Sequence, residues 1–401
     1  MISKHTQLTI ISRAILLLSN FLMIVYTTRC FGAEGRGVIS YVLACVSIIN
    51  ILTNVSGGST LTYHVPKFST KELFTYHLFL SGFFALSGTL VMSIVTNGKF
   101  WSYIFFISLG YAWVNGVANI FLGKKLYVTY NALVVSLSVL PLIIFSILIA
   151  INYTLTLELY FYCMYASLAV LSIVGFVLML KICGWPEAML DTGKWKKLTM
   201  YGIKNELSYL LQFLSYRVSY FFILSKMGYS ALGQFSVAIA LAESIWVVSR
   251  SMSTIHYTDV LHSANMMENR RKTHRQALKG IFLSFLLAVI IFFVPSEWYI
   301  FLFGENFSSV KYLLTYILPG VLAIAFTNLH GHYFSAKGDQ NILIIKSFIG
   351  LAANVVLLSL LIDTFKINAV FIATNVSYTI SSVILAYYFY FVDRKRISCN
   401  S

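Results

Sequence analysis

Residues 32–44 read GAEGRGVISYVLA, and residues 228–240 read GYSALGQFSVAIA. The two stretches align without a gap at an offset of 196 residues, close to half of the 401-residue chain. Four aligned positions are identical: Gly32 with Gly228, Gly37 with Gly233, Ser40 with Ser236, and Ala44 with Ala240. The pattern therefore predicts a chain built from two related halves.

The amino-acid composition indicates whether these halves lie in water or in a membrane. Apolar residue types make up 58% of the chain and charged types 11%, and the mean hydropathy is +0.79. In ordinary soluble domains, apolar types make up about 45–50% of the residues and charged types about 25%. The values exclude a soluble globular enzyme, a disordered chain, a coiled coil and a nucleic-acid-binding domain, and they favour an integral membrane protein.

Membrane-spanning helices need about 20 apolar residues each. The first apolar run is too long for the core of a signal peptide and lacks a small-residue cleavage site, so we expect a membrane helix there. In all, twelve helical spans are predicted, at approximately 8–29, 38–58, 73–96, 101–122, 129–151, 156–181, 202–224, 232–255, 277–296, 311–334, 342–362 and 369–391.

The distribution of charge predicts the topology. The chain has 29 basic and 14 acidic residues, and most basic residues, including Lys337 and Lys346, fall on the side of the N-terminus. Positively charged loops stay in the cytoplasm, so both termini are predicted to be cytoplasmic. We expect an N-terminal six-helix lobe at 1–182, a cytoplasmic linker at 183–201 and a C-terminal six-helix lobe at 202–401. Lobes with an even number of spans share one orientation, so their symmetry axis would lie along the membrane normal.

Polar residues recur every seven positions in the first two spans. Arg13 and Asn20 have this spacing, as do Ser47 and Asn54. Seven residues are nearly two helical turns, so each pair lies close to one face. Ionisable residues at membrane depth are costly unless they face a cavity or a partner. These faces are therefore predicted to line a central cavity between the lobes.

The seventh and eighth predicted spans repeat this design with more charge. The repeat offset places Ser47 on Glu243 and Asn54 on Arg250, so the repeat and the seven-residue spacing select the same face. The polar residues of these two spans include Glu206, Tyr209, Tyr216, Arg217, Glu243 and Arg250.

The arginines on these faces suggest an anionic ligand. Arginine stays protonated and binds phosphate through two parallel hydrogen bonds, so Arg13, Arg217 and Arg250 are predicted to bind a diphosphate. Glu243 and Glu206 are candidates for neutralising these charges, or for taking up the coupling ion, H⁺ or Na⁺, because a desolvated carboxylate protonates more readily. A structural alternative is that all these charges form ion pairs that hold the helices together.

No cofactor, metal site or catalytic site is expected. The sequence contains neither a phosphate-binding loop of ATPases nor a Gly-x-Ser-x-Gly elbow. The five cysteines form no C-x-x-C pair, and His330 and His332 are two residues apart, so they do not share a helix face.

Several short motifs resemble the Wzx-type polysaccharide flippases. They are TRCFGAEGRG at 28–37, FGENF at 303–307, YILPG at 316–320, AKGD at 336–339 and INA at 367–369, together with Asn354 and Tyr378. The resemblance covers nearly all of the chain.

This resemblance implies membership of the multidrug/oligosaccharidyl-lipid/polysaccharide (MOP) exporter superfamily, whose members have two six-helix lobes around a central cavity. Wzx proteins move an undecaprenyl-diphosphate-linked oligosaccharide from the cytoplasmic to the periplasmic leaflet of the bacterial inner membrane. Other polysaccharide assembly proteins are then possible partners. The resemblance implies a cationic cavity, and Arg13 and Arg217 match that expectation.

Two other functions stay open. A drug/cation antiporter of the same superfamily needs an acidic cavity, whereas the acidic residues here are balanced by arginines. A membrane polysaccharide polymerase usually has a large periplasmic loop, and every loop predicted on that side is short.

Overall fold

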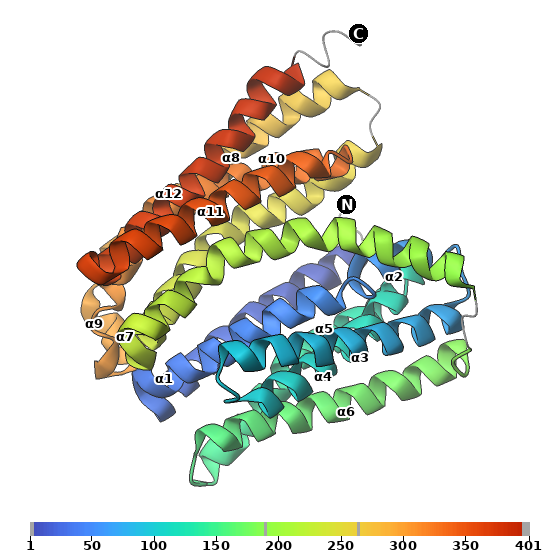
Figure 1. Ribbon diagram of the computed structural model, residues 1–401, viewed down its shortest axis with the longest axis horizontal. Helices are drawn as coiled ribbons and strands as arrows, with labels where there is room; N and C mark the ends of the chain where they lie inside the picture. Colours follow the sequence, from blue (N-terminus) through green and yellow to red (C-terminus); the bar gives the residue numbers. More distant parts are fainter. Residues whose placement is uncertain (1–3, 188–190, 263–264, 395–401) are drawn as a thin grey trace. The chain divides into compact units, whose positions relative to one another are not determined.

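The computed structural model describes residues 4–187, 191–262 and 265–394, and all regular structure in these ranges is helical. The predicted all-α class is therefore confirmed for this part of the chain. Figure 1 shows the elements in chain order: α1 (Lys4–Thr53), α2 (Gly58–His64), α3 (Thr70–Val95), α4 (Trp101–Gly123), α5 (Tyr127–Ala150), α6 (Leu157–Cys183), α7 (Thr192–His262), α8 (Met266–Phe293), α9 (Ser296–Phe303), η1 (Glu305–Phe307), α10 (Val310–Ala336), α11 (Gln340–Phe365), α12 (Ile367–Tyr387) and η2 (Tyr388–Asp393).

Ten helices of the described ranges are long and apolar enough to cross a membrane, as expected for a multi-pass membrane protein. This number is two fewer than the sequence predicts. The difference arises because α1 and α7, which are 50 and 71 residues long, each join two predicted spans. The number of twelve spans and the cytoplasmic location of the termini stay predictions.

One glycine interrupts each of the two long helices. Gly32 in α1 has φ 61° and ψ −165°, and Gly228 in α7 has φ 81° and ψ −179°. Only glycine adopts such angles without strain. On a straight helix Arg217 and Glu243 would lie roughly 39 Å apart, yet their side chains form an ion pair. The chain therefore folds back at Gly228, and α7 provides two arms, one before and one after this glycine.

The chain forms two compact units. The N-terminal unit consists of Met1–Phe31 and Tyr41–Leu210, and the C-terminal unit of Gly32–Ser40 and Leu211–Ser401. The predicted linker at 183–201 includes helical residues, because α7 begins at Thr192. The lobe boundaries predicted from the sequence stay a prediction.

In the N-terminal unit α4 packs against α2, α3, α5 and α6 (Figure 1). Close packing of α3 on α4 depends on Gly116, since a Cβ at this position would overlap the ring of His77. His77 is buried and fully hydrogen-bonded: its Nε2 lies 3.0 Å from the Ala112 carbonyl and its Nδ1 3.1 Å from Ser56 Oγ. The polar ring thus satisfies its hydrogen-bonding groups inside an apolar bundle.

In the C-terminal unit α12 packs against α10 and α11, and α10 packs against α8. Pro319 lies inside α10 and opens its backbone ladder. The amide of Asn375, on α12, fills this opening: its Oδ1 accepts from Gly320 N (2.8 Å) and its Nδ2 donates to Tyr316 O (2.7 Å). A side chain of one helix therefore replaces a backbone hydrogen bond of its neighbour, as membrane proteins require.

The two copies of the repeated stretch cross within the C-terminal unit, to which residues 32–40 belong. A Cβ at Gly37 would overlap the carbonyl oxygen of Tyr229, and a Cβ at Gly233 would overlap that of Ala33. Ala33 and Tyr229 occupy equivalent positions of the repeat. The contact is therefore the same from both sides, and the two glycines let the backbones touch.

A serine pair lies one turn further along this crossing. Ser40 Oγ donates to Ser236 Oγ at 2.8 Å, and Ser236 Oγ donates to the carbonyl of Gly233 at 2.8 Å. Both serines are buried. The repeat detected in the sequence is thus also a physical contact between its copies.

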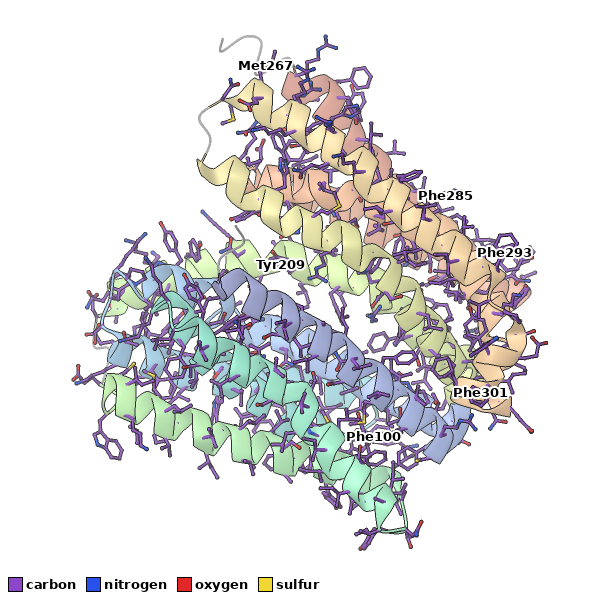
Figure 2. The ribbon with its side chains drawn as sticks, turned by 180° about the vertical axis from the view of Figure 1, so that it is seen from behind. Phe100, Tyr209, Met267, Phe285, Phe293 and Phe301 are labelled. Carbon is purple, nitrogen blue, oxygen red and sulfur yellow. The ribbon has the colours of Figure 1, made fainter. Side chains whose placement is uncertain are left out.

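The outward surfaces of the helices suit contact with lipid. Phe285 and Phe293 on α8 and Phe301 on α9 are exposed, and Figure 2 shows them projecting away from the ribbon. Exposed apolar surface of this extent is compatible with a membrane and not with water.

Candidate functional site

An arginine–glutamate pair joins the two arms of α7 in the C-terminal unit. Arg217 Nη1 donates to Glu243 Oε1 at 2.5 Å, and Nη2 donates to Oε2 at 2.9 Å. The two parallel bonds match the planar fork of the guanidinium to the carboxylate. The side chains are 18% and 25% exposed, so both remain reachable from outside the protein.

Aromatic rings border this pair. The guanidinium carbon of Arg217 lies 5.3 Å from the ring centre of Tyr220 and 5.7 Å from that of Phe213. Cation–π contacts of this kind stabilise a guanidinium that has left water.

A second group of rings lies beside the pair. The Tyr216 ring lies 5.3 Å from Trp246 and 5.1 Å from Tyr378, and Gln212 Nε2 donates to the Tyr216 hydroxyl at 2.6 Å. The Tyr378 hydroxyl is buried and has no hydrogen-bond partner among the described residues. This tyrosine therefore has an unused donor.

Hydrogen bonds hold the first arm of α7 against α11 and α12. Asn354 Nδ2, on α11, donates to the Ser215 carbonyl at 2.8 Å, and Ser215 Oγ lies 3.0 Å from Ser377 Oγ on α12. Ser377 Oγ in turn donates to the Gly350 carbonyl at 2.7 Å. These contacts fix the helix that carries Arg217.

The predicted site residues of the C-terminal unit are only partly brought together. Tyr216, Arg217 and Glu243 share one cluster. Arg250 is exposed, and its charge lies near the side chains of Tyr216 and His332. Glu243 pairs with Arg217, an arrangement that also fits the structural alternative of an ion pair holding the helices together, so the role predicted for Glu243 stays a prediction.

The remaining predicted residues lie in the N-terminal unit. On α1, Arg13 and Asn20 are exposed, and the half-buried Ser47 donates to the Leu43 carbonyl of its own helix at 2.7 Å. Asn54, in the turn after α1, is half-buried. The roles of these residues stay predictions.

The first part of α7 supplies the two other residues. Tyr209, which is labelled in Figure 2, is exposed. Glu206 is buried and forms no hydrogen bond or ion pair with any residue that the structure describes. Asn205 and Gly202 contact the end of α1 and α2 on the same part of this helix, since Asn205 Nδ2 donates to Ser59 Oγ at 3.3 Å.

Three residues of the C-terminal unit were not predicted, and two of them, Trp246 and Tyr378, lie near the pair. Trp246 is three residues after Glu243, so helical spacing alone places it on the same face. Tyr378 appears only in the family resemblance. Lys346 is counted with the cytoplasmic loops in the sequence, but it lies inside α11 on the face toward α12 and is 6% exposed.

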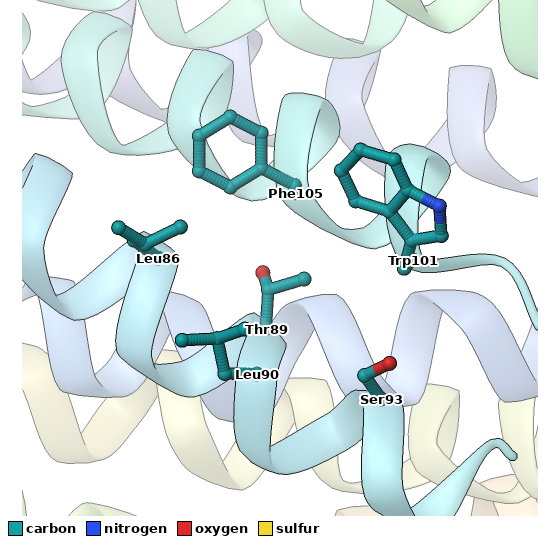
Figure 3. A pocket seen from close by; sticks show the side chains of 6 residues that line it. All are labelled: Leu86, Thr89, Leu90, Ser93, Trp101 and Phe105. Atoms are coloured by element: carbon teal, nitrogen blue, oxygen red, sulfur yellow. The ribbon is translucent and has the colours of Figure 1, made fainter. Parts of the chain in front are cut away.

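A small pocket of about 150 Å³ lies between α3 and α4 (Figure 3). Its lining is largely apolar, with Leu86, Leu90, Trp101 and Phe105 and the hydroxyls of Thr89 and Ser93. It contains no charged group and lies in the other unit from the arginine–glutamate pair. Within the described ranges, no three His, Cys, Asp or Glu side chains cluster as metal ligands would.

Comparisons of the fold give a consistent result. The structure of the MATE multidrug transporter DinF-BH is 11% identical, with a TM-score of 0.69 over 97% of each chain. The MATE transporter VcmN of Vibrio cholerae is 14% identical, with a TM-score of 0.64 over 98% of this chain and 97% of that one. The chain has the MATE-type fold of MOP transporters.

A third solved structure with this fold is a MOP superfamily transporter from Pyrococcus furiosus. It is 18% identical to this chain, with a TM-score of 0.60 over 96% of each chain. Its description states that reverse polarity of the binding pocket suggests a different function for that protein. No protein-family model matches the present sequence, and no curated protein matches it.

Proposed function

We propose that the chain is a flippase of the bacterial inner membrane. It moves an undecaprenyl-diphosphate-linked oligosaccharide, the repeat unit of O-antigen or a related surface polysaccharide, from the cytoplasmic to the periplasmic leaflet. The observation that supports this proposal is the Arg217–Glu243 pair inside the helix bundle, in which the guanidinium holds a carboxylate through two hydrogen bonds with aromatic rings nearby.

The charge of the C-terminal unit favours an anionic substrate. Arg217 and Arg250 are the basic residues near Tyr216, and Glu243 is the acidic residue that pairs with Arg217. A cationic drug would meet repulsion there, whereas a diphosphate would be attracted. The pocket polarity described for the Pyrococcus furiosus protein supports the view that this fold serves substrates of more than one charge.

Substrate binding would exchange the partner of Arg217. A phosphate presents two oxygens at a spacing similar to that of a carboxylate, so the diphosphate replaces Glu243 on the guanidinium fork. Glu243 is then an unpaired carboxylate in a poorly hydrated site and takes up H⁺ or Na⁺. The Tyr216 and Trp246 rings provide flat surfaces for the adjoining sugars.

The N-terminal unit would contribute the rest of the substrate path by alternating access. The proposed contacts there are Arg13, Asn20, Ser47, Asn54 and Tyr209. Glu206 is a second carboxylate for the coupling ion, because it is buried without an ion pair among the described residues.

Complementation of a flippase-null bacterial strain tests this proposal. The wild-type gene restores surface glycan, and R217A abolishes it when the strains are compared at matched amounts of membrane-inserted protein. K226A is the matched control, because Lys226 also lies on α7 but pairs with Asp363 at the surface, where ion pairs contribute little. Full complementation by R217A would refute the assigned role.

A MATE-like drug/cation antiporter is the second candidate. The buried Glu206 is the observation in its favour, since an unpaired carboxylate suits a cationic drug. An expressing strain would then resist cationic drugs, and E206Q would remove the resistance. Resistance without restored surface glycan would favour the antiporter over the flippase.

A further inference from the structure

The outward face of α8 changes character along its length. Arg271, Arg275 and Lys279 are exposed and four residues apart, so they form one stripe. From the next turn onward the exposed residues are apolar; they include Phe282, Phe285, Leu286, Ile290 and Phe293, two of which are labelled in Figure 2. The opposite face is buried, with Asn269, Thr273, Ala277, Gly280, Ser284 and Ala288.

Contacts divide the basic residues at the start of α8 into two classes. Arg270 points inward, where it donates to the carbonyls of Phe389 (3.1 Å) and Tyr390 (3.3 Å) in the π-helix η2. Lys272 pairs with Glu268 at 2.6 Å.

The stripe residues form the second class. Arg271, Arg275 and Lys279 make no hydrogen bond or ion pair with any residue in the described ranges. Three uncompensated charges therefore remain on one exposed face.

The length of α8 places this stripe at a defined depth. Its 28 residues extend roughly 42 Å, whereas the hydrocarbon core of a bilayer is about 30 Å thick. The exposed apolar part from Phe282 to Phe293 faces the acyl chains. The three basic residues, spread over about 12 Å, then lie in the headgroup layer of the same leaflet.

We propose that Arg271, Arg275 and Lys279 form a binding surface for the phosphates of anionic glycerophospholipids. The charges are complementary, and the surface is continuous with the lipid-facing stripe of the same helix. Neighbouring members of the stripe are about 6 Å apart along the axis. A lipid with two phosphates, such as cardiolipin, can therefore contact two of them at once.

Native mass spectrometry of the full-length protein, titrated with cardiolipin, tests this surface. We expect R275Q to weaken cardiolipin binding about fivefold, and R271Q/R275Q/K279Q roughly 100-fold, since each basic residue near an anionic surface contributes about one such factor. Neutral phosphatidylcholine should bind all variants equally. The substituted side chains are exposed, so the variants should elute as the wild type in size-exclusion chromatography.

K272Q is the matched control, because it removes the same charge from the same helix at a residue that is already paired. It should change cardiolipin binding less than twofold. Equal losses for K272Q and R275Q would show that only net charge acts, and this would overturn the proposal. Stripe-dependent binding of undecaprenyl diphosphate without binding of cardiolipin would overturn it as well.

Discussion

The two halves of the chain share a backbone design but differ in charge. Both contain a kink glycine with positive φ and a glycine at the helix crossing. The positions of Arg217 and Glu243, shifted by the repeat offset of 196, are occupied by Phe21 and Ser47. Among the residues that the structure describes, Ser47 bonds only to its own helix. The fold therefore depends on what the halves have in common, and the proposed substrate chemistry on what distinguishes them.

The crossing glycines should give the largest effect. In G37V or G233V the new side chain overlaps a backbone carbonyl, which cannot move away as a side chain could. We expect each variant to lose at least about 3 kcal/mol of stability, since overpacking against a rigid backbone exceeds the usual cost. Thermal unfolding of the purified protein in detergent measures the effect.

The matched control is G82V, because a Cβ at Gly82 in α3 meets no atom within 4 Å. Similar losses of stability in G37V and G233V would support equivalent packing roles for the two glycines. A G233V variant as stable as the wild type, together with a destabilised G37V, would contradict that equivalence.

The charged pair is the next test. R217A should lower stability by about 3 kcal/mol, because it leaves Glu243 half-buried without its partner. R217F/E243S, which copies the residues of the N-terminal half, should recover most of this loss while surface-glycan complementation stays absent. Recovery of complementation by the double variant would show that the charges have no role in transport.

The kink glycines should give a smaller, similar effect in both halves. G228A should cost about 2 kcal/mol, because its φ and ψ lie in a region that is essentially restricted to glycine. G32A should cost slightly more, since its Cβ also meets Asn306 Nδ2 at 3.2 Å. The shift in melting temperature measures both losses of stability. A G228A variant as stable as the wild type would contradict the reversal of the chain at Gly228.

The serine pair should give the smallest effect and an asymmetric one. S236A removes the acceptor of the buried Ser40 hydroxyl and should cost about 1–2 kcal/mol. S40A leaves the bond from Ser236 to the Gly233 carbonyl intact and should cost about 0.5–1 kcal/mol. Equal losses would contradict the donor order described for this pair.

Much of the fold follows from the sequence. Continuous apolar runs predict membrane helices, and the repeat at 32–44 and 228–240 marks the contact between the halves. The count of separate helices differed because the connections at Gly32 and Gly228 have almost no loop. A hydropathy pattern shows where apolar runs end. It does not show that the chain reverses direction at a single glycine while the helix continues on both sides.

The site was less predictable. Regular spacing placed Tyr216, Arg217 and Glu243 on related faces, because helix geometry is local. The pairing of Arg217 with Glu243, the contact of Tyr216 with Tyr378 and the burial of Lys346 depend on which helices pack together. One sequence does not specify that packing.

The helix crossing bears on how such a chain could arise. Each half presents the same short surface, with a glycine that meets the backbone of the other copy and a serine one turn away. A self-complementary patch of this kind is the hallmark of twofold homodimers. Fusion of two half-length copies would preserve such a patch and leave one copy free to acquire charge.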